Sequence, residues 1–225
     1  MDTPIFINMK IFLTVITLAA VCNALILSSC AGLPSQKAHI SPVIPEETAE
    51  LPPETMQTPE FPETSGYIMG KGIVPEEKLA DFLLQINKRA DEDFVRQLAG
   101  YYVEEAAAEG INHDTAFAQM CLETGFLRYG GLVTPDMNNF CGLGAIGPQE
   151  TGHIFPDPRT GVRAHIQHLQ AYASTEPLNQ ELIDPRYRYV KRGSAPTIHG
   201  LAGTWAADRS YDVKIARILR NLYEF

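Results

Sequence analysis

The feature that most constrains this chain is a Pro- and Glu-rich stretch that separates its N-terminus from the remainder. Between residues 33 and 70 there are six glutamates, one lysine and almost no aromatic residues. Its prolines include Pro42, Pro45, Pro52, Pro53, Pro59 and Pro62. Such a stretch buries too little apolar area to offset the entropy of ordering it. We therefore expect a disordered linker over residues 30–70 and one folded domain over residues 71–225.

Residues 1–29 have the features of an export signal. Lys10 precedes a mostly apolar run over residues 11–27, and the sequence Leu-Ser-Ser-Cys then ends at Cys30. This pattern resembles the bacterial lipoprotein signal, in which the cysteine is acylated and becomes the first residue of the mature protein. We expect a lipidated Cys30 that anchors the protein to a membrane, at the periplasmic face of the outer membrane because Ala31 follows it. A transmembrane helix and cleavage without lipid are the alternatives.

The charge of the chain argues against nucleic acid as a partner. The formal net charge is −9, and from Lys71 onward 16 Lys and Arg stand against 20 Asp and Glu. An acidic surface repels phosphate backbones. We predict a monomer with no cofactor.

Two cysteines fall in the expected folded domain, Cys121 and Cys141. An even number of cysteines in an exported protein is compatible with a disulfide. Two buried thiols that behave as small hydrophobic groups are equally compatible with the sequence.

Apolar spacing from Pro75 onward predicts a mainly α domain. Helices are expected from Pro75 through Ile86, over 92–109, after a cap at Asn112, and over 162–173, 198–207 and 211–223. Residues 130–157 are rich in Gly, Pro and Asn, which is typical of a loop with a short hairpin.

One carboxylate stands out at the end of an apolar helix. Residues 116–122 are mostly apolar and lead directly to Glu123. Apolar neighbours and the C-terminal end of a helix dipole both disfavour negative charge, so they raise the pKa of a carboxyl group. A raised pKa is what a general acid for glycosidic cleavage needs.

Four motifs in the same order resemble the glucosaminidase family, the family-73 glycoside hydrolases. They are Glu-Thr-Gly-Phe from Glu123, Asn-Asn-Phe-x-Gly-Leu-Gly from Asn138, residues 161–169, and Gly-Thr-Trp-Ala-Ala-Asp-Arg-Ser-Tyr ending at Tyr211. The resemblance implies an α+β lysozyme-like fold, a helical bundle around a cleft with a small β-hairpin. It also implies cleavage of β-1,4 bonds after N-acetylglucosamine, chiefly in peptidoglycan.

The resemblance also assigns site residues. Glu123 is implied to be the general acid and Tyr211 a second catalytic group that faces the scissile sugar. The residues implied to bind substrate are Asn138, Asn139, Phe140, Gly142 and Trp205. Family members often carry another carboxylate on the hairpin, and the candidates here are Glu150 and Asp157. Neither lies in the usual pattern, so the substrate's own 2-acetamido group is an alternative nucleophile.

Two further functions are alternatives. A muramidase or lytic transglycosylase on the same fold is also compatible with a single catalytic glutamate. An anchored wall-binding protein without activity is the other, and the presence of Glu123 in its motif argues against it. His165 and His168 are three residues apart on an expected helix, a spacing that some metal sites use. Because no third ligand accompanies them, we predict no metal site.

Overall fold

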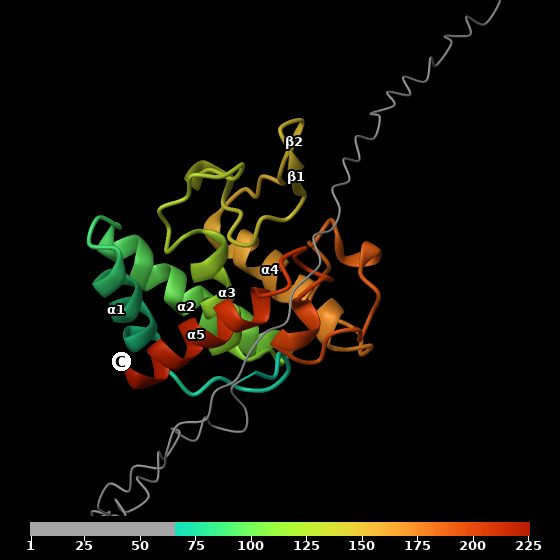
Figure 1. The fold of residues 1–225 in the computed structure, drawn as a ribbon, viewed down its shortest axis with the longest axis horizontal. Coiled ribbons are helices and arrows are strands. Elements are labelled where there is room, and N and C mark those ends of the chain that lie inside the picture. Colours follow the sequence, from blue (N-terminus) through green and yellow to red (C-terminus); the bar gives the residue numbers. More distant parts are fainter. Residues whose placement is uncertain (1–65) are drawn as a thin grey trace, which may run out of the picture. The chain divides into compact units, whose positions relative to one another are not determined.

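The computed structural model describes residues 66–225 (Figure 1). Its helices are α1 (Glu76–Ile86), α2 (Glu92–Glu109), α3 (His113–Glu123), α4 (Pro158–Ala173) and α5 (Tyr211–Glu224). Short 3₁₀ turns are η1 (Pro135–Met137), η2 (Tyr187–Tyr189) and η3 (Ile198–Leu201). Strands β1 (Ala145–Gly147) and β2 (Glu150–Thr151) form an antiparallel hairpin. The expected mainly α fold with a small hairpin is confirmed.

The export signal, Cys30 and most of the predicted linker lie outside the described residues. Over residues 66–225, none of the helices combines the length and the apolar character needed to cross a membrane.

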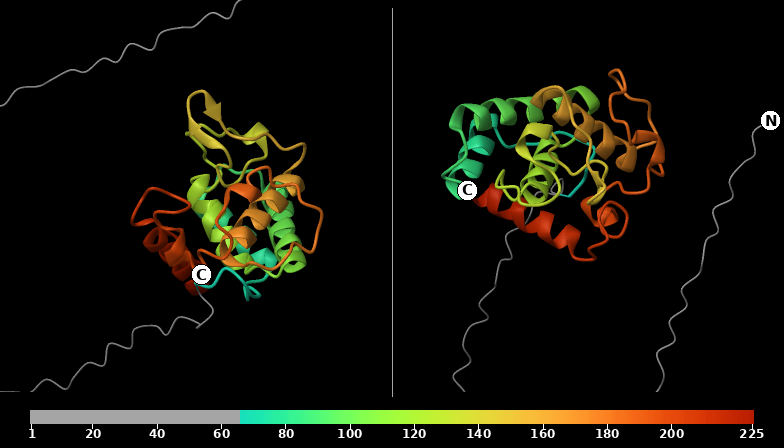
Figure 2. Two further views of the ribbon diagram at one scale, coloured as in Figure 1. Left: turned by 90° about the vertical axis from the view of Figure 1, so that its right-hand side faces the viewer. Right: turned by 90° about the horizontal axis from the view of Figure 1, so that it is seen from above.

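Helix α3 lies in the middle of the bundle, between α2 and α5, as the view along its axis shows (Figure 2). Every residue from His113 to Cys121 is buried. Asn112 begins the helix, because its side chain accepts hydrogen bonds from the backbone N–H groups of Asp114 and Thr115, at 3.0 and 3.4 Å. Such a cap satisfies N–H groups that have no partner within the helix. Because the central helix is capped and buried, the position of its last residue, Glu123, is fixed.

Residues 66–70, which precede the predicted start of the folded domain at residue 71, already take part in its structure. Ile68 is completely buried, and its backbone N–H donates to the carbonyl of Pro196 at 3.0 Å. Tyr67 and Met69 form isolated β-bridges with Thr197 and Ile111. These partners are far away in the sequence, and local composition does not reveal them.

Most helix bounds in the structure agree with those predicted from the sequence, with two differences. Helix α4 begins at Pro158, four residues before the predicted start. The helix expected over 198–207 is only the 3₁₀ turn η3. Gly200 in this turn packs against Ala195, since a Cβ at position 200 would lie 2.7 Å from the Cα of Ala195.

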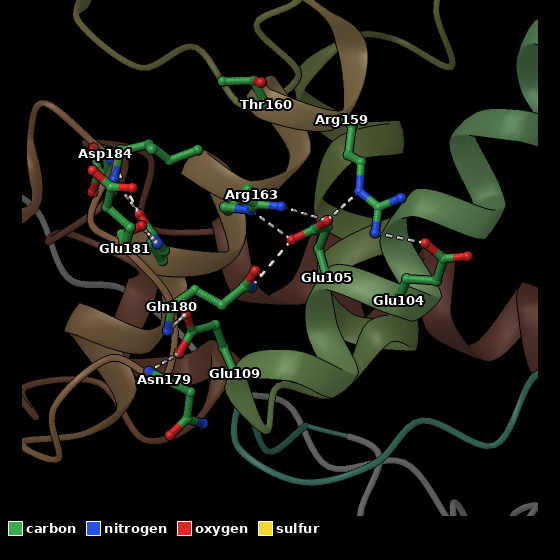
Figure 3. Close-up of polar contacts among 12 residues, drawn as sticks. Glu104, Glu105, Glu109, Arg159, Thr160, Arg163, Asn179, Gln180, Glu181 and Asp184 are labelled. Atoms are coloured by element: carbon green, nitrogen blue, oxygen red, sulfur yellow. Dashed lines mark hydrogen bonds and ion pairs between the residues drawn. The ribbon is translucent and has the colours of Figure 1, made fainter.

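The long connection from α4 to α5 has little regular structure and is held by polar side chains (Figure 3). The carboxylate of Glu105 on α2, only 2% exposed, accepts from Arg159 at 2.6 Å, Arg163 at 2.8 Å and Gln180 at 3.1 Å. Glu109, one turn further, accepts the backbone N–H groups of residues 179 and 180 at 2.8 and 3.1 Å. These contacts hold α4 and residues 179–180 of the connection against α2.

Candidate active site

The chain leaves α3 at Glu123 through a turn of unusual backbone conformation. Thr124 donates its hydroxyl to the Met120 carbonyl at 2.8 Å and accepts from the backbone N–H of Leu127 at 3.0 Å. Phe126, Leu127 and Tyr129 have φ values of 57°, 59° and 56°. Bulky residues rarely adopt this left-handed region, and such strain clusters at functional sites. The turn ends α3 so that the Glu123 side chain projects outward.

Glu123 lines a cleft with a volume of about 340 Å³. Besides Glu123, the lining residues are Thr124, Gly125, Tyr129, Gly131, Leu132, Val133, Asn139, Cys141, Gly142, Ala145, Trp205 and Ala206. They come from the turn after α3, the segment before β1, and the connection before α5. Among these residues Glu123 is the one carboxylate.

The surroundings of Glu123 favour its protonated form. Glu123 is exposed where it lines the cleft, but the surrounding protein partly removes its carboxyl from water, and this desolvation raises its pKa. Hydrogen bonds from Tyr211 and Trp205 act in the opposite direction without cancelling the effect. A carboxyl with a raised pKa can hold a proton near neutrality and release it to a leaving oxygen.

Tyr211, the first residue of α5, contacts Glu123 directly. Its hydroxyl donates a hydrogen bond to Oε1 of Glu123 and accepts one from Nε2 of Gln119 at 2.8 Å. Tyr211 is 4% exposed, and burial together with the nearby Glu123 carboxylate raises its pKa well above the ordinary value. The phenol therefore remains a proton donor across the physiological range. Gln119 lies four residues before Glu123, on the same face of α3, and this spacing is the signal by which the sequence marks it.

The wall opposite Trp205 is shaped by Asn139, which is 1% exposed. Its side chain bonds both backbone groups of Leu143, at 2.9 and 3.0 Å, and donates to the His153 carbonyl at 3.0 Å. Asn139 thus holds the segment that presents Gly142 to the cleft. Gly142 has φ +71°, a conformation that suits glycine.

Besides Tyr211, which contacts Glu123 but is not among the lining residues, two residues expected at the cleft lie elsewhere. Phe140 is completely buried and packs against Phe94, with ring centroids 6.4 Å apart, so the prediction that it lines the cleft is wrong. Asn138 is not among the lining residues, and its side chain donates to the Phe155 carbonyl at 3.0 Å. Sequence proximity to Asn139 and Gly142 suggested both, because a motif does not reveal which way each side chain points.

Gly161 allows this wall to approach α4 closely. A Cβ at position 161 would lie 1.8 Å from the carbonyl oxygen of Asn138 and 3.4 Å from the ring of Phe140. No side chain fits at such a distance. This glycine in the first turn of α4 therefore allows the close approach of residues 138–140, which lead into the cleft wall.

Trp205 forms the opposing wall and packs on two histidines of α4. Its ring centroid lies 5.8 Å from His165, 4.9 Å from His168 and 5.5 Å from Tyr172. Nδ1 of His168 bonds the buried carboxylate of Asp184 at 2.7 Å, while His165 bonds other groups. In the described part of the chain, no three His, Cys, Asp or Glu side chains gather as metal ligands.

The two candidates for a second carboxylate lie away from the cleft lining. Asp157 caps α4, accepting from the backbone N–H and the hydroxyl of Thr160 at 2.9 and 2.8 Å. These hydrogen bonds lower its pKa. Glu150 is exposed on β2.

Cys121 and Cys141 are both buried free thiols rather than a disulfide. Burial raises the pKa of each well above its ordinary value, so neither has thiolate character.

Residues 99–224 match the glucosaminidase family model, described as mannosyl-glycoprotein endo-beta-N-acetylglucosaminidase. This chain belongs to the glucosaminidase family. An uncharacterized protein of Borreliella burgdorferi is 39% identical to it over 191 residues, which are 85% of this chain and 90% of that protein. The solved structure of S. aureus autolysin E, in complex with the muropeptide NAM-L-Ala-D-iGlu, covers 72% of each chain with 12% identity and a TM-score of 0.46. By its family this glucosaminidase-family protein is a glycoside hydrolase.

Proposed function

We propose that this protein is a peptidoglycan hydrolase, an endo-β-N-acetylglucosaminidase that uses Glu123 as its general acid. The observation that carries the proposal is the placement of Glu123, which bonds to Tyr211 and lines a cleft with no other carboxylate among its lining residues. Exported bacterial proteins meet β-1,4-linked N-acetylglucosamine in peptidoglycan, and the N-terminal sequence predicts export. Family membership supports the same bond type.

The cleft favours substrate assistance over a protein nucleophile. A retaining mechanism with a protein nucleophile needs a second carboxylate about 5 Å from the acid, and an inverting one needs it about 6.5–9.5 Å away. Asp157 is engaged as a helix cap and Glu150 is exposed on the hairpin. The 2-acetamido oxygen of the substrate can instead bond to C1 while the C1–O bond breaks. The leaving oxygen then takes the proton of Glu123.

The second half of the reaction returns the proton. Water attacks C1, the Glu123 carboxylate takes a proton from that water, and the bond to the acetamide oxygen breaks. C1 is inverted twice, so the product keeps the configuration of the substrate. Tyr211 supports each step, because its hydroxyl bonds the carboxylate as negative charge appears on Glu123.

The test is digestion of purified sacculi with the wild-type protein and with Glu123→Gln, with fragments identified by mass. New N-acetylglucosamine reducing ends from the wild type alone support the proposal. Muramic ends or anhydro products would assign a muramidase or lytic transglycosylase, for which a lone carboxylate is also sufficient. Binding of sacculi without any released fragment would assign a wall-binding protein.

We further propose that the protein acts while anchored through Cys30 to the periplasmic face of the outer membrane. The Leu-Ser-Ser-Cys sequence supports this location, since multiple acyl chains give firm anchoring. Cys30→Ala should move the protein from the membrane fraction to the soluble fraction. A variant that still sediments with membranes after a salt wash would contradict lipidation.

A further inference from the structure

A chain of buried hydrogen bonds leads from Glu123 into the core. Beyond Tyr211 and Gln119, Oε1 of Gln119 lies 2.9 Å from Nε2 of His165, and Nδ1 of His165 lies 2.9 Å from the hydroxyl of Tyr102. Gln119, His165 and Tyr102 have no exposed surface. They come from α3, α4 and α2, so the chain joins three helices to the first residue of α5.

Each contact in this chain needs one proton, and the protons can be arranged in two directions. His165 is neutral, since burial, with a smaller contribution from His168, lowers its pKa to about 3. A neutral imidazole has one N–H and one acceptor nitrogen. Either every donor points toward Glu123, or every donor points away from it toward Tyr102.

The inner end of the chain decides the direction. Within residues 66–225, the contact with His165 is the one hydrogen bond of the Tyr102 hydroxyl. If Nδ1 of His165 carried the proton, the O–H of Tyr102 would be buried without an acceptor, which is unfavourable. When Tyr102 donates to Nδ1, every O–H and N–H in the chain has an acceptor. The donors therefore run from Tyr102 through His165, Gln119 and Tyr211 to Glu123.

We propose that Tyr102, His165 and Gln119 are positioning residues that fix the proton of Tyr211 toward Oε1 of Glu123 and so keep the acidic proton on Oε2. This inference rests on the proposed role of Glu123. Oε2 is the oxygen nearer the cleft wall, 3.8 Å from where a Cβ of Gly142 would lie. With Oε1 occupied by the Tyr211 donor, a proton on Oε1 would face another proton. The acid is thus always presented toward the sugar.

The first test is direct and independent of activity. The full-length protein in detergent, with ¹⁵N-labelled histidines, reports the tautomer of each imidazole by NMR. His165 should be neutral with its proton on Nε2, from about pH 5 to 8. In Tyr102→Phe, Nδ1 of His165 lacks a partner in either tautomer, so the preference for the Nε2–H form should weaken and the Nδ1–H form should become more populated. A proton on Nδ1 in the wild type, or a charged ring, would overturn the proposal whatever the enzyme does.

The second test separates positioning from folding. Tyr102→Phe removes the hydroxyl that sets the direction, and His165→Phe removes the donor to Gln119. We expect kcat to fall about tenfold or more with KM unchanged, by analogy with other supporting hydrogen bonds. The alkaline limb of the pH profile of kcat should move to higher pH in both variants, because a weakened hydrogen bond from Tyr211 raises the pKa of Glu123. We expect the same shift for Tyr211→Phe.

The titratable groups that face Glu123 bear on this profile. They are Tyr211 from α5, Cys141 from the segment before β1, and Tyr129 from the turn after α3. All three have raised pKa values, and none is changed in Tyr102→Phe or His165→Phe. A shift of the limb in these variants therefore reports on Glu123.

Tyr223→Phe is the matched control. It deletes a hydroxyl that donates to Asp114 at 3.2 Å, outside the chain, so it should lose comparable stability and keep the pH profile. If folded Tyr102→Phe and His165→Phe keep both kcat and the wild-type profile while Glu123→Gln is inactive, the positioning role is wrong and the proposed function stands.

Discussion

Gly161→Ala tests whether the contact between α4 and residues 138–140 sets the cleft. In an exposed helix this change stabilises a protein by about 1 kcal/mol. Here the added Cβ would lie 1.8 Å from the Asn138 carbonyl oxygen, and real Cβ contacts are at least about 3.0 Å. The backbone must therefore move by about 1.2 Å. Overpacking of this kind typically costs about 1–3 kcal/mol, so we expect a net loss of stability.

The same displacement should reach the cleft, because Asn139 and Gly142 follow directly. A misplacement of about 1 Å can reduce a rate about 100-fold. Urea unfolding and kcat/KM on purified glycan measure the two effects. Gly147→Ala is the control, since nothing lies within 4 Å of a Cβ at position 147. A Gly161→Ala variant that is as stable and as fast as the wild type would refute the reasoning.

Three further predictions concern charged side chains. Glu105→Gln should lower the unfolding free energy measured by urea titration by about 2–4 kcal/mol, since it leaves two arginines without their buried carboxylate. Glu104→Gln is the control, because that side chain is 57% exposed and pairs with Arg159, and it should cost under about 1 kcal/mol in the same titration. Burial alone would raise the pKa of Glu105, but hydrogen bonds from Arg163, Arg159 and Gln180 lower it below its ordinary value. The stabilisation by Glu105 is therefore complete above the pKa of the unfolded state and is lost as the pH falls through the pKa of the folded state. The unfolding free energies of the wild type and of Glu105→Gln should accordingly converge in acid. Glu150→Gln and Asp157→Asn should each keep kcat within about tenfold on purified glycan, and if either is as inactive as Glu123→Gln, that residue is the second carboxylate.

The parts of the fold that could be predicted are those with local signals. Gly110 ends α2 and Asn112 caps α3, and both bounds agree with the structure. The start of α4 also had a local signal, Asp157 followed by Pro158, which is a cap and a favoured first residue. We weighed Asp157 as a catalytic group and so overlooked its role as a cap.

The site was predictable where a residue acts through its motif and not where it acts through tertiary contacts. Glu123 and Trp205 line the cleft, and Tyr211 contacts Glu123. The partners of His165 come from helices 46 and 63 residues away in the sequence, so spacing could only suggest a metal pair with His168. Contacts of this kind become visible only when the helices are packed together.

The burial of α3 on every side has a consequence for amide hydrogen exchange. Amides in such a helix open only with the whole domain, whereas the exposed hairpin opens locally at far lower free energy. Within residues 66–225 we therefore expect α3, which carries Glu123, to exchange among the slowest elements, and the hairpin near the cleft wall to exchange faster. Under the proposed function, a glycan strand in the cleft would meet a fixed acid beside a hairpin that can adjust to the strand.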